Sequence, residues 1–176
     1  MKSLKYLILF VVALFSTATV LSSCSSDDNE IESSNKIEKF VIGGSLEYVN
    51  VIKNPTNENS SVSTKSDGNT CFHFVLNGKY CADYGYAWIE INIPTSSFKE
   101  GKDITGDISD MTVRLPSSDE SAHYTSKFGK GLNVKSGKVQ ITKLTNERAT
   151  VRINKFVVQL GETTLNIDGM GSCEIK

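Results

Sequence analysis

The side chains best suited to contacting a ligand are four aromatic residues in one short stretch, Tyr80, Tyr84, Tyr86 and Trp88. Flat rings with polar edges stack against sugar and peptide surfaces. Trp88 has the same strand parity as Glu90, which predicts that it lies on the polar face of its strand. The alternative is that Trp88 caps one end of the core beneath a loop, because tryptophan is highly buried on average.

Two histidines, His73 and His123, limit the catalytic chemistry available to the chain. His73 alternates with Phe72 and Phe74, and we interpret it as a hydrogen-bonded structural residue of a strand. The sequence contains no Gly-x-Ser-x-Gly, His-Glu-x-x-His or Cys-x-x-Cys motif and no phosphate-binding glycine loop. We therefore expect a protein that is not an enzyme and binds no cofactor. An enzyme that assembles its site from distant loops would leave no such motif.

Three aspartates, Asp103, Asp107 and Asp110, make one segment acidic. Carboxylate oxygens are ligands that calcium prefers. The spacing of these three residues lacks the alternating ligands and the glycine of an EF-hand loop, so we interpret them as solvated turn residues. The sequence predicts no metal site.

The N-terminus has the pattern of a secretory signal peptide. Lys2 and Lys5 precede ten unbroken apolar residues, 6–15. A run of this length suits the hydrophobic core of a signal peptide and falls short of the roughly 20 residues needed to span a bilayer. The alternative is a short membrane helix that is not cleaved.

The end of this segment, Leu21-Ser22-Ser23-Cys24, resembles the lipobox of bacterial lipoproteins: a branched apolar residue, two small residues and a cysteine. In that family the chain is cleaved before the cysteine, whose sulfur and new amino group are acylated. The resemblance implies cleavage between Ser23 and Cys24 and a membrane anchor at Cys24. Each buried CH₂ of a lipid contributes about 0.8 kcal/mol, so several acyl chains would hold the protein permanently on the membrane. The alternative is a chance cysteine near an ordinary cleavage site.

The residues after Cys24 include Ser26, Asp27 and Asp28. They are similar to the Ser/Asp-rich export signal of surface-exposed lipoproteins of Bacteroidetes. This resemblance implies a protein of the outer membrane that is exposed at the cell surface. The alternative is an acidic, solvated tether, with the folded part on the periplasmic face. We expect a signal peptide at residues 1–23, an acylated cysteine and flexible tether at 24–36, and one folded domain at 37–176.

Charge excludes one class of partner. Lys2 and Lys5 account for two of the 19 basic residues, so 17 basic residues face 20 acidic ones beyond the signal peptide. No basic stripe or block is present, and we therefore expect no nucleic-acid partner.

Three cysteines remain if Cys24 is acylated, and at most one disulfide forms among Cys71, Cys81 and Cys173. Residues 77–78, Asn-Gly, predict a two-residue hairpin turn. Such a turn would place Cys71 opposite Tyr84 and direct Cys71 and Cys81 to opposite faces. A bridge would therefore involve Cys173, and three buried thiols are the equal alternative.

Alternating apolar residues, with no window of helical spacing, predict short strands throughout the domain. We expect an unusually long loop at residues 54–69, which contain one apolar side chain, and a bulge near Asn154 and Lys155 where apolar parity shifts. The expected strands are 37–52 (one bulged strand or two), 70–76, 86–93, 111–115, 123–128, 138–144, 149–160 and a closing strand through Leu165, Ile167, Cys173 and Ile175.

These patterns predict an all-β, single-domain protein, either an antiparallel β-sandwich or a lipocalin-like closed barrel. The chain as a whole is similar to small exported lipoproteins of gut-type Bacteroidetes. We expect a lipid-anchored lipoprotein of the outer membrane or cell surface, with a non-catalytic domain that binds a glycan, a peptide or a partner protein. The alternative is a structural or accessory component of an outer-membrane assembly.

Metabolic labelling with a palmitate analogue will mark the wild-type protein and leave Cys24→Ala unlabelled, because that variant lacks the sulfur that carries the lipid. In-gel fluorescence at equal protein level measures the difference, and Cys71→Ala serves as the matched control that keeps the label. Label that persists in Cys24→Ala would contradict attachment at this residue.

Overall fold

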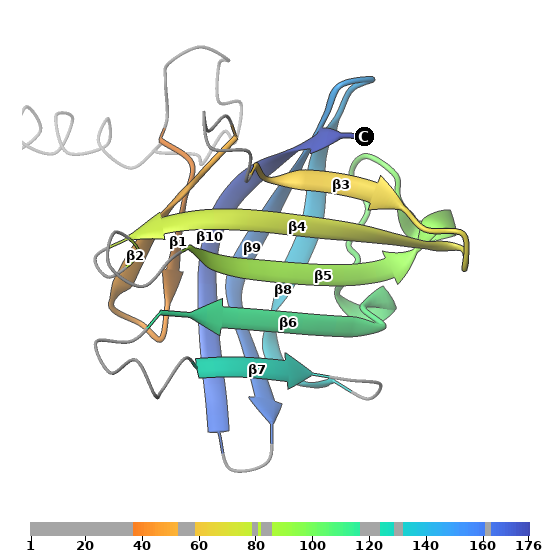
Figure 1. The fold of residues 1–176 in the computed structure, drawn as a ribbon. Helices are drawn as coiled ribbons and strands as arrows, with labels where there is room; N and C mark the ends of the chain where they lie inside the picture. Colours follow the sequence, from red (N-terminus) through yellow and green to blue (C-terminus); the bar gives the residue numbers. More distant parts are fainter. Residues whose placement is uncertain are drawn as a thin grey trace, which may run out of the picture. The chain divides into compact units, whose positions relative to one another are not determined.

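The structure is a computed structural model, drawn as a ribbon in Figure 1. It describes residues 37–52, 59–78, 81, 86–116, 124–128, 132–160 and 163–176. The predicted anchor and export residues lie outside these ranges: Ser23, Cys24, Ser26, Asp27 and Asp28. Within the described ranges, no helix has the length and hydropathy needed to cross a membrane.

The described part of the chain is almost entirely β, with two short 3-10 helices, η1 (Thr95–Ser97) and η2 (Thr105–Asp107). The strands are β1 (Lys39–Ile42), β2 (Leu46–Asn50), β3 (Ser61–Thr64), β4 (Asn69–Gly78), β5 (Ala87–Pro94), β6 (Asp110–Leu115), β7 (Tyr124–Phe128), β8 (Asn133–Leu144), β9 (Arg148–Leu160) and β10 (Thr163–Ile175).

Five strands close into a barrel in the order β4–β2–β1–β10–β3. The strand β3 completes the ring because it pairs in parallel with β10 on one side and antiparallel with β4 on the other. The sheet continues beyond the ring through β5, β6 and β7 on the β4 side, and through β9 and β8 on the β10 side. The expected all-β single domain is confirmed, and its ring is a closed barrel built on fewer strands than a lipocalin has.

The core lies between two layers of this sheet. In Figure 1, β4 to β7 form a layer that crosses the long strands β8, β9 and β10. Ile89, Ile91 and Ile93 lie on the face of β5 opposite Trp88 and Glu90, and they have no exposed surface. Phe40 of β1 and Phe74 of β4 meet edge to face, with ring centroids 5.3 Å apart. Because strand residues alternate between faces, this burial fixes which side chains of β4, β5 and β6 turn outward.

The bulge predicted near Asn154 and Lys155 is present, because the register of β9 against β10 shifts across these residues. Lys155 has a φ of 45°, and its backbone N–H donates to Asp168 Oδ1 at 2.8 Å. On the neighbouring strand, Gly137 has a φ of 86°, and a Cβ there would overlap the Lys155 carbonyl. The bulge therefore requires glycine beside it as well as the extra residue in β9.

A buried polar cluster joins three strands of the barrel at one end. Asn50, the last residue of β2, is 7% exposed, and its Nδ2 donates to Glu38 Oε2 at 2.9 Å and to the Ser172 carbonyl at 2.8 Å. Glu38, immediately before β1, also accepts from the backbone N–H and the hydroxyl of Ser172 in β10, both at 2.6 Å. A carboxylate, an amide and a hydroxyl thus satisfy one another where water has little access.

Ser60 extends this cluster to β3 and β4. Its hydroxyl donates to Asn50 Oδ1 at 2.7 Å and accepts from the backbone N–H of Val75 at 2.8 Å. Its backbone N–H donates to the Val51 carbonyl at 2.8 Å, and its carbonyl accepts from the Glu174 N–H at 3.0 Å. Ser60 has no exposed surface, so water does not substitute for these partners. Residues from all five strands of the ring, or directly beside them, meet at this cluster.

The two-residue turn predicted at residues 77–78 is wrong. Asn77 and Gly78 belong to β4 and pair with Val49 and Tyr48 of β2, and the β4–β5 register places Leu76 opposite Ala87. The glycine serves another purpose: a Cβ at Gly78 would lie 2.5 Å from Cδ1 of Tyr48. A close approach of an aromatic ring therefore accounts for a residue that local sequence assigns to a turn.

The long loop predicted at residues 54–69 is also wrong over its second half. Residues 61–64 form β3, and Val62 is 2% exposed. A strand with one apolar residue is held here because both of its edges are paired, to β10 and to β4. Residues 53–58 lie outside the described ranges.

Three thiols in the described residues, those of Cys71, Cys81 and Cys173, are free and buried. The observed register places Cys71 opposite Asn92 on the outer face of the sheet, whereas Cys173 belongs to the core. Burial raises the pKa of Cys71 and of Cys173, which keeps both as unreactive thiols. Of the two alternatives left by the sequence, the structure has the three buried thiols.

Ser60→Ala will destabilise the domain by about 1–3 kcal/mol, because the Val75 N–H and Asn50 Oδ1 each lose a buried partner. Urea unfolding of wild type and variant measures the loss. Ser63→Ala, at an exposed position of β3 three residues later, is the matched control and should stay within about 0.5 kcal/mol of wild type. Equal stabilities for the two variants would contradict a structural role for the cluster.

Candidate binding site

The outer face of β3, β4, β5 and β6 carries two cross-strand rows of polar and aromatic side chains. The strand register places Ser61, His73, Glu90 and Thr112 opposite one another in one row. The adjacent row contains Val75, Trp88 and Arg114. Directly opposed residues on one face of antiparallel strands lie about 4.5–5.5 Å apart at Cβ, so each row is a continuous line of contacts.

A groove of about 430 Å³ follows these rows. Its volume lies within the range of about 300–1,000 Å³ that small-molecule sites occupy. Four strands, a residue two positions before β3 and the residue after β10 line the groove: Asn59, Ser61, His73, Val75, Trp88, Glu90, Thr112 and Lys176.

His73 and Glu90 are the titratable pair of the groove. His73 Nδ1 lies 3.1 Å from Glu90 Oε1, and the two side chains are 34% and 38% exposed. An ionised carboxylate only accepts hydrogen bonds, so Nδ1 carries the proton in this contact. The expectation that His73 is hydrogen-bonded is confirmed. Its partner orients the ring and leaves Nε2 available to a ligand.

Trp88 lies between a histidine and an arginine. Its ring centroid is 6.3 Å from that of His73, with 40° between the ring planes. The guanidinium carbon of Arg114 lies 4.4 Å above the centroid of the indole ring. Trp88 is partly buried and stands on the outer face, as its parity with Glu90 predicts. One face of the ring is therefore covered by a cation, and a ligand would meet the ring together with that guanidinium.

The predicted aromatic cluster is only partly described. Tyr86 precedes β5 and is partly buried, whereas Tyr80 and Tyr84 lie outside the described ranges. The structure instead groups Trp88 with Arg114, which the sequence analysis did not single out. The strands containing both residues were expected, but no turn signal gave their register, so the pairing was not predictable.

Asp103 and Asp107 form turn contacts, whereas Asp110 begins β6. One carboxylate oxygen of Asp107 and one of Asp110 are buried, so the interpretation of all three residues as solvated turn residues is wrong in part. Asp103 Oδ1 accepts from the backbone N–H and the hydroxyl of Thr105, at 3.1 and 2.6 Å, and these bonds lower the pKa of Asp103. Lys102 Nζ lies 3.3 Å from Asp107 Oδ2. No group of three metal-binding side chains occurs among the residues that the structure describes.

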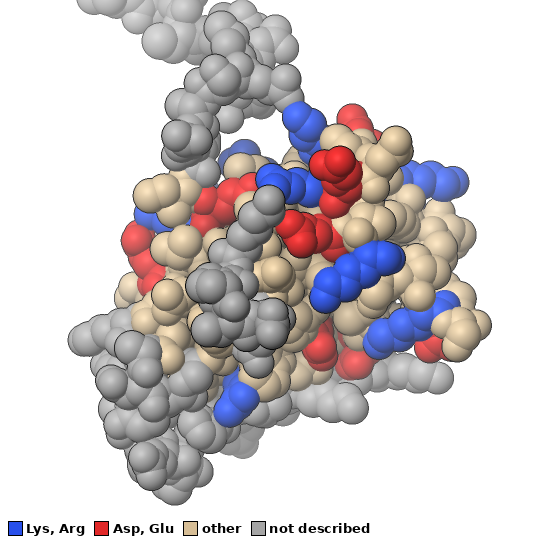
Figure 2. Space-filling view, turned by 45° about the horizontal axis from the view of Figure 1, so that its top comes forward, with Lys and Arg blue, Asp and Glu red and all other residues tan. Residues whose placement is uncertain are grey.

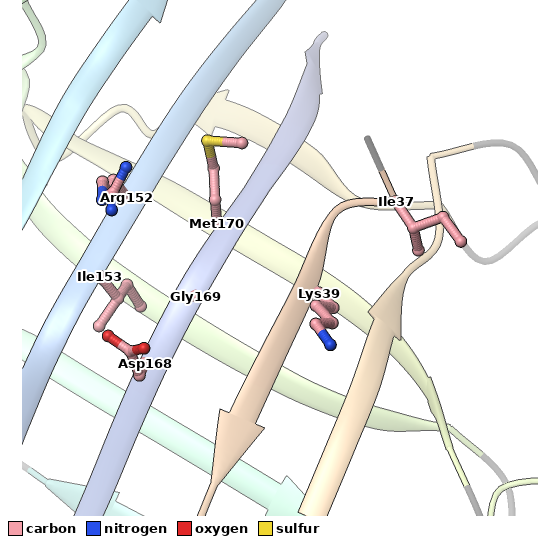
Figure 3. Close-up of a pocket in the computed structure, with 7 residues that line it drawn as sticks. All are labelled: Ile37, Lys39, Arg152, Ile153, Asp168, Gly169 and Met170. Atoms are coloured by element: carbon pink, nitrogen blue, oxygen red, sulfur yellow. The ribbon is translucent and has the colours of Figure 1, made fainter. Parts of the chain in front are cut away.

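A second hollow of about 240 Å³ lies on the outer face of β1, β9 and β10. Figure 3 shows Arg152 and Met170 projecting from the neighbouring strands β9 and β10, with Lys39 across the hollow on β1. Two of its charged groups are engaged within the protein: Lys39 pairs with Glu47 at 2.9 Å, and Asp168 accepts the Lys155 N–H. This hollow offers fewer free polar groups than the groove, so the groove is the better candidate site.

The face of the domain that Figure 2 presents does not favour a polyanion. Figure 2 shows basic and acidic side chains interspersed over the face it presents, without a block of one sign.

No protein-family model, curated protein or solved structure matches the chain. The residues of this chain alone therefore indicate what the protein binds.

Arg114→Ala will make the tryptophan fluorescence easier to quench with acrylamide, because the guanidinium no longer covers the indole ring. Trp88 is the single tryptophan, so the signal reports this site alone. Arg152→Ala, on β9, is the control and should leave quenching unchanged. The loss of unfolding free energy in Arg114→Ala should be about 0.5–1 kcal/mol, as for an exposed cation–π contact. Unchanged quenching would show that Arg114 does not cover the ring in solution.

Proposed function

We propose that this protein is a lipid-anchored lipoprotein of the outer membrane, exposed at the cell surface, whose β-domain binds a glycan without cleaving it. The resemblance of Leu21-Ser22-Ser23-Cys24 to a lipobox supports the anchor, and Ser26, Asp27 and Asp28 support surface exposure. The periplasmic face remains the alternative location if those acidic residues are only a tether.

The groove on β3 to β6 is the observation that carries the binding function. Sugar hydroxyls both donate and accept hydrogen bonds, and the groove offers both kinds of partner. Glu90 Oε atoms accept, the Lys176 ammonium donates, and the Thr112 hydroxyl does either. Trp88 adds an apolar ring surface beside them. Polar groups that flank an aromatic ring suit a pyranose, which has apolar C–H faces and polar edges.

A glycan fits this surface better than the other ligands considered. An extended peptide that added a strand would need a free sheet edge. Here both edges of β4 and β5 are already paired. Nucleic acid would require a basic stripe with stacked aromatic rings. The groove instead mixes Glu90 and Lys176 around one tryptophan.

Binding without catalysis is supported by the carboxylates of the groove. Most glycoside hydrolases use two carboxyl groups on opposite sides of the scissile bond. Glu90 is the one carboxylate side chain among the described residues that line the groove, and it is held by His73. A single oriented carboxylate can position a hydroxyl but does not supply the acid and base pair.

A second candidate function is an accessory role in an outer-membrane assembly. It is favoured by three large apolar side chains exposed near the β1–β2 hairpin: Ile37 (69%), Leu46 (38%) and Val49 (45%). Exposed apolar side chains can mark a protein contact when they form a patch, and these three lie on or beside β1 and β2. They are few, and the groove presents more specific chemistry, so we rank the assembly role second.

The full-length mature protein in detergent micelles will bind members of a glycan array, and Glu90→Gln will weaken that binding by about 1.5–3 kcal/mol, as expected for loss of a hydrogen bond to a charged group. Trp88→Ala will weaken it as well, because the ring platform is removed. Calorimetric titration of array hits measures both changes.

Glu47→Gln is the matched control for Glu90→Gln, since Glu47 is an exposed carboxylate with a basic neighbour, Lys39, away from the groove. It should bind as wild type does. A blank array would refute glycan binding. If, in addition, Val49→Ser abolished co-purification of a membrane protein, the accessory role would replace it.

A further inference from the structure

We infer that the glycan bound in the groove carries a carboxylate group and that the Arg114 guanidinium binds it. This inference rests on the proposed glycan-binding function and specifies the chemical class of the ligand. Arg114 lies directly across the strand pair from Trp88, and Thr112 of the same strand lies across from Glu90. Arg114 therefore borders the groove, on the outer face that Thr112 shares.

Arg114 is an oriented cation without a protein counter-ion among the described residues. Its one described contact is the stacking of its guanidinium carbon 4.4 Å from the Trp88 centroid. Lys39, Lys102 and Lys138, by contrast, each lie within 4.0 Å of a carboxylate oxygen. A guanidinium over an indole ring is fixed in position, while its edge N–H donors stay available.

The nearby acid, Glu90, forms its described ion pair with His73 and not with Arg114. Glu90 is in the adjacent row of the same face, but its Oε1 contacts His73 Nδ1 at 3.1 Å. The two adjacent rows on this face therefore differ in chemistry. One row presents Trp88 and the Arg114 guanidinium, which no carboxylate of the described residues contacts, and the other presents an oriented carboxylate and imidazole. A ligand with both an anionic group and hydroxyls would bind in one direction only.

A carboxylate matches the guanidinium better than a neutral polar group does. Its two coplanar oxygens accept two parallel N–H bonds from the guanidinium fork, and such charge-assisted pairs are among the strongest hydrogen bonds in proteins. Uronic acids and other sugar acids place this planar anion beside an array of hydroxyls. The ligand class is therefore an acidic saccharide with a carboxylate, bound by Arg114 and with its hydroxyls directed to His73 and Glu90.

The test compares uronic-acid oligosaccharides with the same oligosaccharides after chemical reduction of each carboxyl to a neutral hydroxymethyl group. The full-length mature protein in detergent is titrated by calorimetry with both members of each pair. The acidic member should bind about 10- to 150-fold more tightly than its reduced counterpart, as for loss of a charge-assisted hydrogen bond. Its affinity should fall as salt rises, while that of the reduced form should change little.

Arg114→Gln should erase the preference for the acidic member, and Arg114→Lys should restore only part of it, because lysine has charge but no planar fork. Arg152→Gln, an exposed arginine on β9, is the matched control and should keep the full preference. Circular dichroism and thermal unfolding verify that each variant is folded, so that a change in preference reports recognition.

The outcomes separate the two proposals. Equal affinity for acidic and reduced members, lowered by Trp88→Ala, would overturn the carboxylate inference and leave glycan binding standing. An acid preference that persists in Arg114→Gln would also overturn it, because the anion would then be bound elsewhere. Binding to none of the acidic, reduced or neutral saccharides would refute the proposed function itself, and with it the inference.

Discussion

The barrel depends on a hydrogen-bonded cluster that only a closed ring can assemble. The cluster contains Glu38 at the entry to β1, Asn50 at the end of β2, Ser60 at the entry to β3 and Ser172 near the end of β10. The backbone N–H of Val75 in β4 also donates into it. Each of these polar groups would be costly to bury alone, so the cluster favours the one arrangement that satisfies them all. The short strand β3, with a single buried apolar side chain, is held by this cluster and by pairing on both edges.

Closing the ring also determines the candidate site. Once Ser60 joins β3 to β4, the register places Ser61 opposite His73, and the antiparallel pairs continue through Glu90 to Thr112. The apolar residues of β5 face the core, which forces Trp88 and Glu90 outward. The groove is therefore built on a rigid sheet rather than on loops. Its side chains can change without altering the core, because strand alternation separates the two faces.

The sequence pattern predicted the features that depend on local alternation of apolar and polar residues. It did not predict the features that depend on how the strands pair in register. In β5 isoleucines alternate with polar residues, and near Lys155 the apolar residues shift from one strand face to the other. The structure has buried isoleucines in β5 and a bulge at Lys155. The turn predicted at Asn77 and Gly78 is wrong, because the glycine is needed for the close approach of the Tyr48 ring and does not form a turn. The strand β3 has no alternation of apolar and polar residues in the sequence. Backbone pairing with β10 and with β4 holds it in place instead. Arg114 could not be assigned to Trp88 without knowing how β5 and β6 align.

The contact between Arg114 and Trp88 changes how an outward tryptophan should be interpreted. A bare indole on a sheet would favour any flat apolar surface, including an aggregating neighbour. Covered by a guanidinium, the same ring becomes a support that holds a cation in place, and the surface presented to a ligand is charged and directional. In the adjacent row His73 contacts Glu90, and no ion pair between Glu90 and Arg114 occurs among the described residues. Under the proposed function, this arrangement would select a ligand with both an anion and hydroxyls, because reversing the ligand would place its anion against Glu90.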